Sequence, residues 1–163
     1  MKARRMASAG VFCALLAVIS QVVIPLPAGV PLSFQVFAVS LCGCCLGWKW
    51  GAVSVAVYLL LGGVGLPLFS SFGGGIGWLL GPTGGFLWGF LPLVLGCGTK
   101  KYRYAFGGLA VCHLLGIFWL AQVQQITPWQ AAVAGSLPYC GKDVLLVWAA
   151  FWTAKRIPQK FFQ

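Results

Sequence analysis

The residue most suited to specific chemistry is Asp143, the only Asp or Glu in a chain that carries eleven Lys and Arg residues. It follows Lys142 directly, at the start of an apolar segment. An acid at a helix N-terminus can simply accept hydrogen bonds from free backbone N–H groups. An acid within an apolar segment is costly, however, and usually faces a cavity or a partner. We therefore interpret Asp143 as a candidate ligand-binding residue.

Two other polar side chains could act with this carboxylate. Lys142 can pair with Asp143, bind a carboxylate of a ligand, or only extend its charged end to the water interface. His113 is the single histidine and lies in a different apolar segment. One His, one Asp and scattered Cys do not form a metal site or a hydrolytic triad, so we expect His113 to make structural hydrogen bonds. An intramembrane enzyme is the alternative. It would need two or more converging catalytic polar groups, for which the sequence offers Asp143, Lys142 and His113.

Seven cysteines are spread along the chain without a pair of C-x-x-C motifs. Three of them, Cys42, Cys44 and Cys45, lie within one apolar run. We expect the cysteines to be small apolar packing residues.

The composition is that of an all-α integral membrane protein. Of the 163 residues, 60% are hydrophobic and 7% are charged, whereas a soluble domain has about 25% charged residues. The length fits a single transmembrane domain, residues 1–163, with about six helices of about 20 residues. The net charge of +10 does not indicate a nucleic-acid partner, because the basic residues are scattered between apolar runs.

Six apolar segments are expected to cross the lipid bilayer: 6–24, 33–48, 51–63, 76–96, 104–123 and 142–153. With six crossings, every Lys and Arg except Lys142 falls on one side, which the positive-inside rule makes cytoplasmic together with both termini. The basic start of the chain is similar to that of a signal peptide, but no clear A-x-A cleavage site follows it, so we expect a retained first span.

The three connections on the opposite side, 24–31, 65–75 and 127–141, are rich in Pro, Gly and aromatic residues. We expect turns or re-entrant loops that fold over the outer end of the bundle and wall a pocket. Gly84 and Gly85 in the motif 81–86 are expected to let two backbones approach closely. Small residues also recur along the first segment, where they can pack internally or receive another membrane protein: Ala9, Gly10, Cys13, Ala14 and Ala17.

Several of these motifs together resemble the BioY family, the biotin-binding S components of energy-coupling factor (ECF) transporters. The central signature of that family is similar to Pro67-Leu68-Phe69, Gly74-Gly75 and the stretch from Gly81 to Phe90. Weaker similarity covers Pro25 to Gln35, and Leu137-Pro138-Tyr139 followed by Asp143. The resemblance extends in order over nearly the whole chain.

The resemblance implies a multi-pass protein of the bacterial inner membrane that binds biotin near the outer face and transports it, without a cofactor. It implies that the first helix contacts a transmembrane T component and that two cytoplasmic ATPases hydrolyse ATP, so that this chain is not itself an enzyme. An S component for another vitamin is the alternative. The residues expected at the ligand are Gln35, Phe69, Ser71, Phe72, Trp78, Thr83, Phe86, Lys142 and Asp143.

One position departs from the family pattern. The family usually carries a Lys three residues after the Asp, and here that position is Leu146. Lys142 lies one turn earlier, about 40° away around the helix and about 6 Å along its axis. Its long side chain could reach the same group of a ligand, although helical side chains lean toward the N-terminus and carry it outward.

Overall fold

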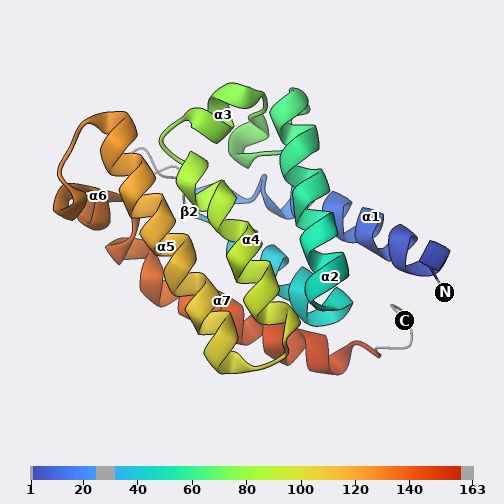
Figure 1. The fold of residues 1–163 in the computed structure, drawn as a ribbon. Coiled ribbons are helices and arrows are strands. Elements are labelled where there is room, and N and C mark those ends of the chain that lie inside the picture. Colours follow the sequence, from blue (N-terminus) through green and yellow to red (C-terminus); the bar gives the residue numbers. More distant parts are fainter. Residues whose placement is uncertain (1, 25–31, 159–163) are drawn as a thin grey trace.

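The computed structural model describes residues 2–24 and 32–158, and these residues form an almost entirely helical bundle (Figure 1). A short antiparallel hairpin pairs β1 with β2. A 3₁₀ turn at Ser70–Phe72 precedes α3. The elements in chain order are α1 (Lys2–Ile19), β1 (Val23–Ile24), β2 (Leu32–Ser33), α2 (Gln35–Val64), α3 (Ile76–Leu80), α4 (Gly84–Gly98), α5 (Tyr102–Gln124), α6 (Pro128–Gly135) and α7 (Leu137–Arg156).

The all-helical prediction is confirmed, and the differences lie at the connections. The predicted segment 76–96 is interrupted after α3, and most of the predicted connection 24–31 lies outside the described residues. The prediction that 127–141 forms turns or re-entrant loops was wrong, because α6 and the first turn of α7 occupy this stretch. Thr127 and Gln130 form a capping box, and proline is tolerated in a first helical turn, as for Pro128 and Pro138.

The second and third predicted segments are two limbs of α2 that meet at Gly47. This residue has φ 75° and ψ 175°, a conformation that favours glycine. The limbs fold back on each other, since Cys42 Sγ lies 3.8 Å from the carbonyl oxygen of Gly51. A single glycine therefore reverses the chain between two apolar helices.

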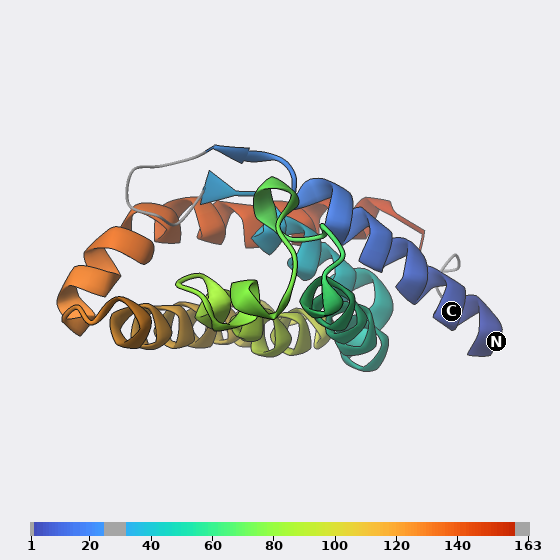
Figure 2. The same cartoon turned by 90° about the horizontal axis from the view of Figure 1, so that it is seen from above.

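The helices form two layers, which are seen from above in Figure 2. One layer contains α4 and α5, and the other contains α7 with the β-hairpin and α1 nearby. The two limbs of α2 pack against α1, α4 and α7 and join the layers. In both views the first turn of α1 and the last turn of α7 lie toward the same end of the bundle.

Small residues set the separation of α4 and α5. A side-chain carbon on Gly85 would lie 2.5 Å from the carbonyl oxygen of Leu115, and one on Gly108 would lie 2.6 Å from that of Pro92. The close approach predicted for Gly84 and Gly85 is therefore confirmed. The cysteines also pack as predicted: all seven are free thiols, and six of them are buried.

The outer faces of the bundle are apolar. Val64, Leu114 and Phe118 are each more than 60% exposed. By length and composition alone, α2 and α5 are long and apolar enough to cross a membrane, and α4 is a shorter apolar helix. The 30 residues of α2 are divided at Gly47, however, and do not form one continuous span.

We expect Gly85→Ala to lower the free energy of unfolding by about 1–3 kcal/mol, because its methyl group would overlap the backbone of α5. Thermal unfolding in detergent measures the change. Gly107→Ala is the matched control, since nothing lies within 4 Å of the added carbon. Equal melting temperatures for the two variants would contradict this account of the α4–α5 packing.

Candidate functional site

A cavity lies between the two layers, at the end of the bundle that carries α3 and α6. It contains about 640 Å³ that protein atoms do not fill, and part of this space is open to the surroundings. The lining is mostly apolar, with a small set of polar groups. The lining residues are Ser33, Gln35, Val36, Phe69, Ser70, Trp78, Thr83, Phe86, Leu87, Phe90, Cys112, His113, Gly135, Tyr139, Lys142 and Asp143.

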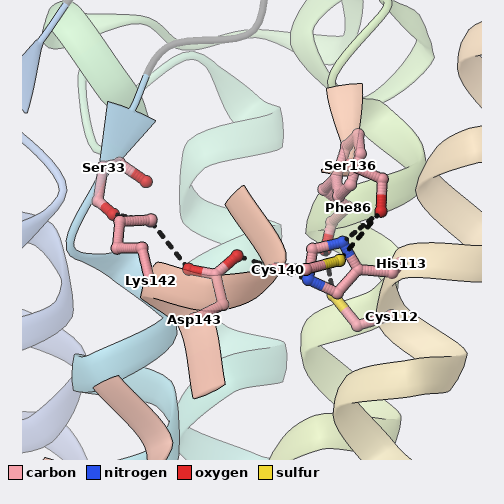
Figure 3. A network of polar contacts seen from close by, with 8 residues as sticks. All are labelled: Ser33, Phe86, Cys112, His113, Ser136, Cys140, Lys142 and Asp143. Atoms are coloured by element: carbon pink, nitrogen blue, oxygen red, sulfur yellow. Dashed lines mark hydrogen bonds and ion pairs between the residues drawn. The ribbon is translucent and has the colours of Figure 1, made fainter. Parts of the chain in front are cut away.

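Asp143 lies at the centre of the polar lining, in the second turn of α7. Its side chain is 6% exposed; Oδ1 lies 2.7 Å from Lys142 Nζ and Oδ2 lies 3.3 Å from His113 Nε2 (Figure 3). Neither contact is aligned as a hydrogen bond, so that Asp143 Oδ1 and His113 Nε2 are both buried without one. A buried carboxylate with unused hydrogen-bonding capacity is a strong acceptor for N–H donors.

Lys142 connects this carboxylate to the β-hairpin. Its Nζ donates a hydrogen bond of 2.6 Å to the carbonyl oxygen of Ser33, while the same atom pairs with Asp143. Of the three interpretations of Lys142, the structure shows the pairing with Asp143. The ammonium group has three N–H donors, so one remains for another acceptor.

His113 extends the polar network to the junction of α6 and α7. Its Nδ1 lies 2.8 Å from Ser136 Oγ, which is also 3.5 Å from Cys140 Sγ. The structural hydrogen bond expected for His113 is therefore present. Its position in the cavity beside Asp143 was not predicted, because the two residues are 30 positions apart and only the packing of α5 near α7 brings them together.

A second network holds the loop before α3 in place. Gln35 Oε1 accepts hydrogen bonds from Ser33 Oγ and Ser70 Oγ at 3.1 and 3.2 Å, and Gln35 Nε2 donates to Tyr58 Oη at 2.9 Å. Tyr58 in turn donates to the carbonyl oxygen of Leu68 at 3.1 Å. Gln35 therefore supports the wall of the cavity, and among the described residues its second amide N–H has no hydrogen-bond partner.

The structure brings most of the predicted ligand residues together, but not all of them. Phe69, Trp78 and Phe86 form the aromatic part of the lining. Ser71 and Phe72 do not line the cavity: Phe72 is 72% exposed, and both residues have φ 57°, which turns the loop outward. The missed neighbour Ser70 lines it instead; nothing in the sequence distinguishes these adjacent serines.

Two further predicted positions can be placed. Thr83 lies before α4, where its hydroxyl makes no capping hydrogen bond, and it lines the cavity. Leu146, the position at which the family carries Lys, packs against the hydrophobic core.

The predicted stripe of small residues on α1 is divided between two faces. Ala9 and Cys13 are buried, and the carbonyl oxygen of Ala9 accepts a hydrogen bond of 2.8 Å from Ser54. Gly10 and Ala14 are exposed, and Ala17 is partly buried against the core. Internal packing thus accounts for part of the stripe and leaves a face of small residues uncovered.

Comparison with known proteins decides the family. The family model described as BioY matches residues 1–162. The chain belongs to the BioY family. The curated member from Pyrococcus horikoshii, a probable biotin transporter BioY, is 37% identical, with 96% of this chain and 98% of that protein aligned. The biotin transporter BioY of Thermotoga maritima is 38% identical, with coverages of 94% and 95%.

A solved structure with the same fold agrees with this assignment. The crystal structure of an S-component for biotin from an ECF-type ABC transporter superposes with a TM-score of 0.84. The superposition covers 95% of this chain and 90% of the S-component chain, and the two sequences are 22% identical. The chain is therefore a helical membrane protein with the fold of an S component, and BioY members are transporter components rather than enzymes.

We expect Lys142→Met to destabilise the fold by about 3 kcal/mol, because it leaves the buried Asp143 carboxylate without its cation. The double variant Lys142→Met/Asp143→Asn should recover part of that loss, since no charge is then left unpaired. Thermal unfolding in detergent gives both values, with the exposed Lys101→Met as a control. Additive effects of the two substitutions would show that the ion pair does not couple them.

Proposed function

We propose that this chain binds biotin in the cavity around Asp143 and carries it across the membrane as the S component of an ECF-type transporter. Curated relatives over nearly the full length are named biotin transporters, and the fold is that of an S-component for biotin. The observation that carries the proposal is the buried, incompletely hydrogen-bonded carboxylate of Asp143 in an aromatic cavity.

The chemistry of the cavity suits a bicyclic urea. The fused rings of biotin present two ureido N–H donors and one carbonyl acceptor, and Asp143 can accept from the N–H groups. Thr83, which has a hydroxyl not used for capping, can donate to the carbonyl oxygen. Phe69, Trp78 and Phe86 can enclose the apolar parts. A few polar anchors within an apolar wall are the usual arrangement of a small-molecule site.

We propose that Lys142 takes the place of the Lys that the family carries at the position of Leu146. Leu146 packs against the core, whereas Lys142 lines the cavity and retains an N–H donor beyond its contacts with Ser33 and Asp143. In this proposal the cation at the ligand lies one turn earlier on α7, where it also pairs with Asp143.

The proposed location is the bacterial inner membrane, crossed about six times with both termini in the cytoplasm. The placement of α1 and α7 supports this topology, since the first turn of α1 and the last turn of α7 lie toward the same end of the bundle. The last turn of α7 carries Lys155 and Arg156, as expected of a cytoplasmic end. Among the basic residues, Lys160 lies outside the described part of the chain.

The proposed partners are a transmembrane T component and two cytoplasmic ATPases, which supply the energy. The uncovered face of α1 supports the first contact, because Gly10 and Ala14 offer little steric hindrance to another helix.

Asp143→Asn should weaken biotin binding by roughly 100-fold, because a charged acceptor is replaced by an amide that also presents N–H groups. Lys142→Ala should weaken it less, by about tenfold. Equilibrium binding of radiolabelled biotin to detergent-purified protein measures both values, with Lys101→Ala as the control. Wild-type protein that shows no saturable biotin binding but binds another vitamin would favour a different S component.

Gly10→Trp should reduce co-purification of the T component and biotin uptake by cells at least tenfold, while biotin binding by the isolated chain stays unchanged. The bulky ring would obstruct the small-residue face of α1. Val111→Trp, on the exposed face of α5, is the control. Normal assembly of the Gly10 variant would place the T component elsewhere.

A further inference from the structure

His113 is held from two sides within the cavity. Its Nδ1 lies 2.8 Å from Ser136 Oγ, and its Nε2 lies 3.3 Å from Asp143 Oδ2. The edge of the ring meets Phe86, with 6.1 Å between the ring centroids and an interplanar angle of 84°. With 10% of its side chain exposed, the imidazole has little freedom to turn.

These two contacts decide which ring nitrogen carries the proton. An ionised carboxylate only accepts hydrogen bonds, so Nε2 has to be protonated where it faces Asp143. In the neutral ring, Nδ1 is then an acceptor, and the Ser136 hydroxyl donates to it. The opposite tautomer would direct the lone pair of Nε2 at the carboxylate. The 3.3 Å contact between His113 Nε2 and Asp143 Oδ2 is not aligned as a hydrogen bond. We therefore expect the N–H dipole of the ring to interact with the carboxylate by electrostatic attraction alone.

We propose that His113 positions the Asp143 carboxylate for the ligand and that uptake of a proton by this ring weakens ligand binding. The inference rests on the proposed function, since it concerns the same site. Once protonated from water, the ring carries a full positive charge, and Ser136 becomes its acceptor. Asp143 then faces two cations, His113 and Lys142, and its oxygens become poorer acceptors for a neutral N–H donor.

The other titratable groups around the ring come from α5 and α7. Cys112 precedes His113 on α5, while Tyr139, Cys140 and Lys142 join Asp143 on α7. Facing residues of α2 and α4, including Gln35 and Phe86, do not titrate. Thiols, phenols and ammonium groups ordinarily change charge above about pH 8 and carboxylates below about pH 5. An unperturbed histidine is the side chain that ordinarily changes charge between about pH 5 and 8.

Binding measured between about pH 5.5 and 8 tests the proposal, with biotin methyl ester as the probe because it has no titrating carboxyl group. Wild-type affinity should fall about three- to tenfold on acidification. His113→Ala should bind about tenfold more weakly than wild type at about pH 8 and show no pH dependence. His113→Gln, which keeps an N–H donor, should recover part of that affinity, also without pH dependence. The exposed Gln124→Ala on α5 is the control and should follow wild type.

A second measurement needs no ligand. Since the chain contains a single histidine, ¹⁵N-histidine labelling gives one imidazole whose nitrogen chemical shifts report the tautomer. We expect the Nε2–H form at about pH 8. The Nδ1–H form, or the same pH dependence in wild type and His113→Gln, would overturn the proposal. If wild type binds no biotin, the proposed function fails, and the tautomer alone decides whether His113 positions Asp143.

Discussion

The site is organised around the buried carboxyl group of Asp143 and the side chains that surround it. Burying an ion costs several kcal/mol unless partners compensate, and Asp143 recruits one partner from its own helix and one from α5. Lys142 is also hydrogen-bonded to Ser33 of the β-hairpin, and His113 contacts Ser136 at the α6–α7 junction. The compensation of one charge therefore links three separate parts of the chain around a single cavity.

Glycine determines whether those partners can meet. The close approach of α4 and α5 at Gly85 places Phe86 and His113 on the same wall. On the opposite wall, Gln35 and Tyr58 use their hydrogen bonds to support the loop that carries Phe69 and Ser70. The polar groups of the cavity thus have two different roles, since some hold the backbone and others keep capacity for a ligand.

Much of the architecture could be predicted from the sequence, because apolar length and charge position are local signals. Asp143 could likewise be selected as a candidate site residue from composition, because it is the single acidic residue of the chain. The pairing with His113 could not be predicted, because it depends on how α5 and α7 sit against each other. Choosing Ser71 over Ser70 failed for a related reason: in a turn with positive φ, neighbouring side chains point in different directions and the sequence does not say which.

The reversal at Gly47 has a consequence for the surroundings of the protein. At 1.5 Å per residue, the limb 35–46 of α2 is roughly 18 Å long and α4 is roughly 22 Å long, both shorter than a hydrocarbon core of about 30 Å. Most residues of the limb 35–46 are buried and shielded by neighbouring helices. Lipids beside the partly exposed α4 can adjust to its length by thinning locally, which costs a fraction of a kcal/mol per ångström of mismatch. Bilayer thickness thereby becomes a variable of this fold, and shorter acyl chains accommodate it at lower elastic cost.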